Sequence, residues 1–155
     1  MKKAIFAAGL LVFTVSTFAG AQDQLMMGTW KANVAKSRYV PGAVSRNEVL
    51  RIDPVGDRFK VTLDGINQQG PYHSEATGKF DGVDVPVFAA PPRQAEFTYA
   101  FRRIDGHTWE ILIKVNGAPQ IVVRNVVSAD GQTMTATSTA INAGVVNQVV
   151  VYEKQ

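Results

Sequence analysis

Residues 93–127 read RQAEFTYAFRRIDGHTWEILIKVNGAPQIVVRNVV and decide the fold. Three runs of alternating apolar and polar residues are separated here by Asp105-Gly106 and Asn116-Gly117. Successive side chains of a strand point to opposite sides of a sheet, so this alternation predicts strands with one buried and one solvated face. Asp-Gly and Asn-Gly favour type I′ turns, which need positive φ at both central residues. The stretch therefore predicts an antiparallel meander of three strands.

Similar alternation extends on both sides of the meander. Further X-Gly turn signals occur at Asp64, Asp81 and Asp130, which raises the expected total to about eight to ten short antiparallel strands. A sheet of this width curls because strand twist accumulates, and closing it removes edges that would pair with other chains. We expect an all-β, antiparallel up-and-down β-barrel. A two-sheet β-sandwich is the alternative, and the short hairpin links favour the barrel.

The first 21 residues are predicted to be a signal peptide. Lys2-Lys3 precede the uncharged apolar run of residues 4–18, and Ala19-Gly20-Ala21 offers the small residues of a cleavage site. The apolar run is shorter than the roughly 20 residues of a membrane-spanning helix. We expect cleavage after Ala21, a periplasmic or secreted location, and a single domain over residues 22–155.

Charge and cysteine content narrow the function classes. The chain has 16 basic and 13 acidic residues, and losing Lys2 and Lys3 leaves 14 basic ones. These charges are scattered rather than clustered, so nucleic acid is not an expected partner. With no cysteine, the domain depends on apolar burial and closed backbone hydrogen bonding instead of disulfides.

Gly28-Thr29-Trp30 at the start of the first predicted strand resembles the Gly-x-Trp motif of the lipocalin and wider calycin group. In that group the Trp closes one end of the barrel and packs beside an Arg from a late strand. The resemblance implies this structural role for Gly28 and Trp30, and it matches Arg124 to the late Arg.

A second resemblance covers most of residues 22–155. The segments GTWKANVAKS (28–37), KFDGVDVP (79–86), SADGQTMT (128–135) and VYEKQ (151–155) are similar to a family of small exported bacterial lipocalin-like proteins. This resemblance implies a barrel fold and an exported location. It implies no reaction.

Aromatic residues are the candidate ligand-binding groups. They line a ligand cavity or else fill the core, because a barrel of this size has an interior that just accommodates side chains or one small ligand. Small residues of the later strands, Ala136 and Ala140, leave room for a cavity. The candidate ligand-binding residues are His73, Tyr72, Phe97, Tyr99, Phe101 and Trp109.

Catalytic signals are sparse. His73 and Glu75 share a strand face, so they suit a general base or part of a metal site that Asp81 and Asp84 would complete. The alternative is that His73, Glu75, Thr77 and Lys79 simply form a solvated strand face. We assign no catalytic residue, no metal ligand and no cofactor.

Three functions remain in order of preference. The first is a binding protein that holds a small apolar or amphipathic molecule in the barrel mouth. The second is a packed barrel that acts through its surface as a protein-interaction or envelope-stress module, whose protein partner the sequence does not name. A carboxylate- and His-based enzyme is third. A membrane-spanning barrel is disfavoured because one face carries regularly alternating Lys, Arg and Glu and the hairpins are short.

Overall fold

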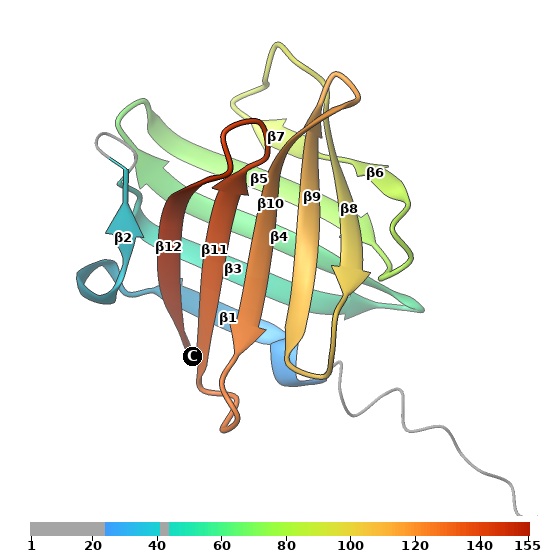
Figure 1. Cartoon of the computed structure of the whole chain (residues 1–155). Helices are drawn as coiled ribbons and strands as arrows, with labels where there is room; N and C mark the ends of the chain where they lie inside the picture. The colour runs from blue at the N-terminus through green and yellow to red at the C-terminus, as the bar shows by residue number, and fades with distance from the viewer. Residues whose placement is uncertain (1–23, 41–43) are drawn as a thin grey trace, which may run out of the picture.

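The computed structural model describes residues 24–40 and 44–155 and shows an all-β protein. The predicted signal peptide, residues 1–21, lies outside the described residues. One antiparallel sheet bends round into a nearly closed barrel, with β8–β12 on one wall and β3–β5 crossing behind them (Figure 1). The predicted all-β, antiparallel up-and-down barrel is confirmed, although the sheet has 12 strands rather than the expected eight to ten. The strand order is β6-β8-β9-β10-β11-β12-β1-β3-β4-β5-β7, with β2 paired to β12.

The predicted meander is present as three consecutive antiparallel strands. At the second turn, Asn116 and Gly117 have φ values of 50° and 77°, as the type I′ prediction requires. The first turn differs from the prediction, because neither Asp105 nor Gly106 has a positive φ. Instead, the Asp105 carboxylate accepts hydrogen bonds from the backbone N–H groups of His107 at 2.8 Å and Thr108 at 2.7 Å. The strands are β8 (Phe97–Arg103), β9 (Thr108–Val115) and β10 (Ala118–Val127).

The two ends of the chain meet in the sheet. The first strand pairs with both the last strand and the third, with Trp30 opposite Lys154 on one side and Leu50 on the other. This pairing joins the two walls without a long crossover, which is how the up-and-down order closes. The strands are β1 (Gly28–Ala32), β3 (Arg46–Val55), β4 (Arg58–Asn67), β5 (Gly70–Gly78), β11 (Thr133–Ala140) and β12 (Val145–Lys154).

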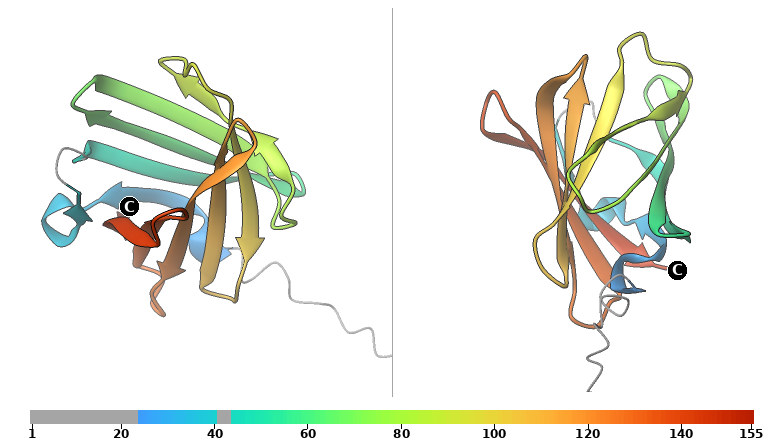
Figure 2. Two further views of the ribbon diagram at one scale, coloured as in Figure 1. Left: turned by 45° about the horizontal axis from the view of Figure 1, so that its top comes forward. Right: turned by 90° about the vertical axis from the view of Figure 1, so that its right-hand side faces the viewer.

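The closure has one seam, between β5 and β8. The predicted strand over residues 83–88 is divided into β6 (Asp84–Pro86), which pairs with β8, and β7 (Phe88–Ala90), which pairs with β5. Both lie on the side seen in the right-hand view of Figure 2. Side chains meet across the seam, where Gly78 of β5 lies against the Phe101 ring of β8.

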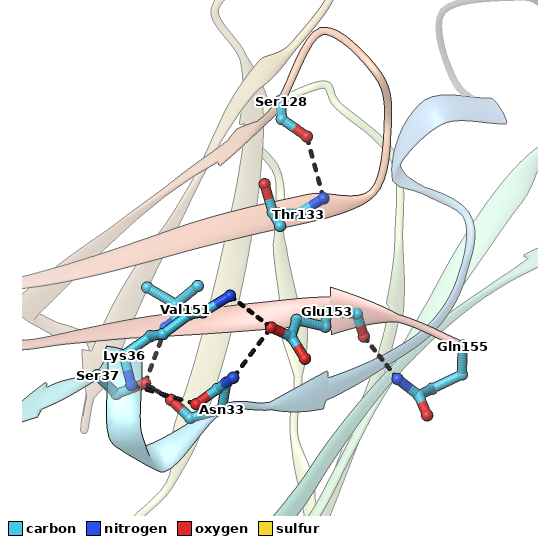
Figure 3. Close-up of polar contacts among 8 residues, drawn as sticks. All are labelled: Asn33, Lys36, Ser37, Ser128, Thr133, Val151, Glu153 and Gln155. Atoms are coloured by element: carbon cyan, nitrogen blue, oxygen red, sulfur yellow. Dashed lines mark hydrogen bonds and ion pairs between the residues drawn. The ribbon is translucent and has the colours of Figure 1, made fainter.

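A short segment fastens the start of the chain to the last strand. The 3₁₀ turn η1 (Val34–Lys36) and β2 (Arg38–Tyr39) follow β1. Asn33 Nδ2 and Lys36 Nζ each donate to Glu153 Oε1 at 2.9 Å, and the Val151 N–H donates to Ser37 Oγ at 3.0 Å (Figure 3). These contacts bridge more than 100 residues of sequence.

Trp30 closes one end of the core, as the Gly-x-Trp resemblance implies. Its side chain is fully buried and its indole N–H donates to the Met26 carbonyl at 2.9 Å. The cation over the ring is the Lys154 ammonium, 5.0 Å from the centroid, rather than Arg124. Arg124 instead bonds Glu110, on the opposite side of β10 from the cavity-lining Val123 and Asn125. The cation that packs on Trp30 therefore comes from the last strand, β12, which pairs with β1.

Candidate ligand-binding cavity

The barrel interior is filled at one end and hollow at the other. Along several of the long strands, the inward residues nearest Trp30 are closely packed, and those two or four positions further along line a cavity. On β8, for example, Phe101 is fully buried and packs its ring 4.9 Å from that of Phe59, whereas Tyr99 lines the cavity. The filled end contains Met26, Trp30, Ile52, Phe59, Phe101, Val127 and Met134.

The cavity has a volume of about 510 Å³ and is mainly apolar. A mostly apolar hollow of a few hundred Å³ with a few well-placed polar groups is typical of small-molecule sites. The polar groups here come from different strands and include Glu48, Asn125, Ser138 and Tyr152. Apolar lining is supplied by Val40, Leu50, Val61, Leu63, Ile111, Ile113, Ile121, Val123 and Val150.

Glu48 is the central polar group of the cavity. Its residue is only 6% exposed, and it accepts hydrogen bonds from two tyrosine hydroxyls. Tyr72 of β5 donates to Oε2 at 2.5 Å, and Tyr152 of β12 donates to Oε1. Ser45 Oγ lies 2.6 Å from the Tyr72 hydroxyl and extends the network. The carboxylate thereby connects strands from both walls of the barrel.

A β-bulge shapes this network. Between Arg46 and Val49 the register of β3 against β4 shifts, and Asn47 has a φ of 51°. The extra residue changes which side chains face inward, so Ser45 is buried and Arg46 is exposed. Bulges commonly re-aim side chains in this way. The bulge therefore places a small hydroxyl, and not a guanidinium, beside Tyr72.

Gly65 of β4 leaves space for the same network. Its cross-strand partner is Tyr72, and a Cβ on Gly65 would lie 2.5 Å from the Tyr72 hydroxyl oxygen and 2.9 Å from Ser45 Oγ. Real Cβ atoms do not approach other atoms so closely. Glycine is thus required here for close approach, since the Tyr72 ring crosses over its face.

Burial keeps these tyrosines neutral. Desolvation raises the pKa of Tyr152 well above its ordinary value of 10.0, and the neighbouring Glu48 charge and hydrogen bond raise it further. The same causes, in the same order, raise the pKa of Tyr72. Burial also raises the pKa of Tyr99, although the charge of Arg93 and the bond to Ser74 oppose it. The hydroxyls therefore remain hydrogen-bond donors across the neutral pH range.

Two further polar side chains have spare hydrogen-bonding capacity at the cavity. The indole Nε1 of Trp109 is buried and has no hydrogen-bond partner within the described part of the chain. Asn125 is 2% exposed, and its amide group makes one long contact of 3.5 Å with the Val123 carbonyl. Buried polar groups usually have partners. Both residues line the cavity.

The structure separates the six predicted binding residues. Tyr99 and Trp109 line the cavity. Tyr72 lines a shallower depression of about 430 Å³, which adjoins the cavity at Glu48 and Leu63. Phe101 belongs to the filled end, and Phe97 lies under the Arg93 guanidinium, 4.3 Å from its ring centroid, away from the cavity.

His73 is on the opposite side of β5 from the inward Ser74. Its Nδ1 lies 2.7 Å from Asp64 Oδ1, and its Nε2 lies 3.8 Å from Glu75 Oε2. The His73–Glu75 pairing is thus present, but Asp84 does not join it, because that carboxylate binds Lys114 at 2.7 Å. The cluster lies on a partly solvated strand face with several exposed ion pairs. This arrangement matches the solvated-face alternative.

Sequence reasoning missed Glu48, Tyr152, Asn125 and Ser138. The sequence did indicate that Glu48 faces inward, because it lies on the same side of one predicted strand as Leu50 and Ile52. A carboxylate on a buried face calls for partners. Those partners come from strands 24 and 104 residues away, which local pattern does not indicate.

Comparisons with known proteins add the following. No protein-family model and no curated protein matches the chain. Among solved structures, a redesigned β-barrel, mFAP1, determined with DFHBI bound, is similar with a TM-score of 0.45 and 14% identity, over 84% of this chain and 96% of that one. Within residues 24–40 and 44–155, no helix has the length and apolar character needed to cross a membrane.

Proposed function

We propose that this protein is an exported lipocalin-like carrier that holds a small apolar or amphipathic molecule in the hollow end of its barrel. The observation that supports this most is the cavity of about 510 Å³, which is walled by aliphatic side chains from β3, β4, β9, β10, β11 and β12. The export half of the proposal rests on the signal-peptide pattern of residues 1–21.

The cavity wall suits a ligand with one polar end. Apolar burial supplies affinity at about 25 cal/mol per Å² of surface removed from water. Orientation would come from the few polar groups, above all Glu48, Asn125 and the Trp109 indole N–H. A wholly apolar ligand would leave those groups without partners, which costs free energy.

A titration with the neutral fluorophore N-phenylnaphthylamine tests binding. We expect saturable fluorescence enhancement with one site per chain. Ala136→Phe should weaken it strongly, because Ala136 lines the cavity and a ring there occupies ligand volume. Thr137→Phe is the matched control, since the adjacent residue of β11 points to the other side of the sheet.

Thermal unfolding of both variants establishes that each is folded. Equal weakening by the two substitutions, or no saturable binding to the native protein, would contradict the carrier function and favour action through the outer surface. The export proposal is tested separately: mass analysis of protein from the host's periplasm or medium should show a chain that begins at Gln22.

A further inference from the structure

The described residues that line the cavity carry formal charge of only one sign. Of the residues that line it, Glu48 alone carries a formal charge, and no Lys, Arg or His is among them. An apolar cavity with a single carboxylate and no cation is an asymmetric environment. It disfavours a ligand carboxylate, because two like charges in a low-dielectric site repel and the second one has no partner.

Glu48 retains unused acceptor capacity. A carboxylate has about four lone-pair positions, and the hydroxyls of Tyr72 and Tyr152 occupy two of them, one on each oxygen. The two tyrosines also hold the group in place, so a ligand would not pay to order it. The remaining positions accept from a donor that enters the cavity.

The cations nearest this end have other partners. Arg93 lies over the Phe97 ring at 4.3 Å, and His73 bonds Asp64 at 2.7 Å. Both border the adjoining depression and not the cavity itself. An anionic head group thus meets no Lys, Arg or His among the described residues that line the cavity.

From these contacts we infer that the ligand is an amine-bearing amphiphile, whose ammonium group pairs with Glu48 while its apolar body fills the cavity. This rests on the proposed carrier function and specifies the ligand class. An ammonium group offers up to three donors, and a hydrogen bond between opposite charges is roughly twice as strong as a neutral one. Asn125 of β10 and Ser138 of β11 also line the cavity, and their side-chain oxygens offer further acceptors.

The test uses three probes with the same chain: dodecylamine, dodecanol and dodecanoate, each displacing N-phenylnaphthylamine below its micelle concentration. For the native protein we expect dodecylamine to displace at a concentration at least about tenfold lower than dodecanoate, with dodecanol between them. Glu48→Gln should reduce that ratio to near unity. Glu75→Gln, which removes the same charge from the outer side of β5, should leave the ratio unchanged.

If Glu48→Gln does not fold, the native ratio and its retention in Glu75→Gln decide whether the amine inference stands. Equal displacement by dodecylamine and dodecanoate, or equal loss of preference in Glu75→Gln, would overturn the amine inference alone. Failure of all three chains to displace the fluorophore would overturn the carrier function as well.

Discussion

Gly78 of β5 lies directly against the ring of Phe101 of β8, so that a Cβ on Gly78 would be 2.7 Å from the Phe101 Cδ2 atom. The contact spans the seam where the two strands are not hydrogen-bonded to each other. At this point the barrel is closed by side-chain packing rather than by a backbone ladder. The glycine permits that close approach.

Gly78→Ala should therefore destabilise the protein by about 1–3 kcal/mol, the usual cost of overpacking a core. The neighbour that must move is a fully buried aromatic ring rather than a flexible chain end. Chemical denaturation measures the change. In a Phe101→Leu background the cost should fall, and an undiminished cost there would show that ring contact is not its source.

The buried tyrosines predict the alkaline limit of stability. The four tyrosines, Tyr39, Tyr72, Tyr99 and Tyr152, all have pKa values raised above 10.0, with burial as the largest cause. A raised pKa contributes stability that is complete below 10.0 and is lost as the pH rises through the folded-state value. Tyrosinate absorbance should consequently appear together with loss of β-sheet circular dichroism. Ionisation centred at pH 10.0 in a folded protein would contradict this account.

Glu110 predicts an acid effect of the opposite sign. Burial raises the pKa of this carboxyl, but hydrogen bonds from Arg102 at 2.8 Å and Arg124 at 2.6 Å outweigh burial and bring the pKa below 4.5. Its stabilisation is present above 4.5 and is lost as the pH falls through the lower folded-state value. Because both guanidinium groups are largely exposed, the effect is modest.

Glu110→Gln should cost about 1–2 kcal/mol at neutral pH and less in acid, as judged from urea unfolding at both pH values. Glu96→Gln is the control, because the Glu96 side chain is exposed to solvent. A cost for Glu110→Gln that does not change with pH would rule out the ion pairs as its origin.

The meander followed from the sequence because it depends on local signals. Period-two alternation from Phe97 onward sets the face of each strand, and Asn116-Gly117 sets one hairpin. The Asp105-Gly106 prediction was wrong because the Asp105 side chain competes for the turn's backbone N–H groups. The local sequence pattern does not determine whether a type I′ turn or a turn held by the Asp105 side chain forms.

The cavity is formed by contacts between strands that are distant in the sequence, so only some of its lining residues could be predicted. Tyr99 and Trp109 could be placed near it from their alternation, but the aromatic series on β8 divides between the cavity and the filled end at Phe101. Whether a side chain lines the cavity or belongs to the filled end depends on its position along the barrel axis. That position is set by the stagger between strands. Lys154 takes the place over Trp30 for the same reason, since register places it opposite that residue.

Adjacent residues of β10 provide the most direct test of the central claim that ligand is held inside the barrel. Val123 lines the cavity, whereas Val122 points to the other side of the sheet. Methyl NMR during a dodecanol titration should shift the Val123 resonances, together with those of Ile111 and Val150, and leave Val122 and Val126 in place. Shifts confined to Val122 and Val126 would place the ligand on the outer surface and contradict the carrier function.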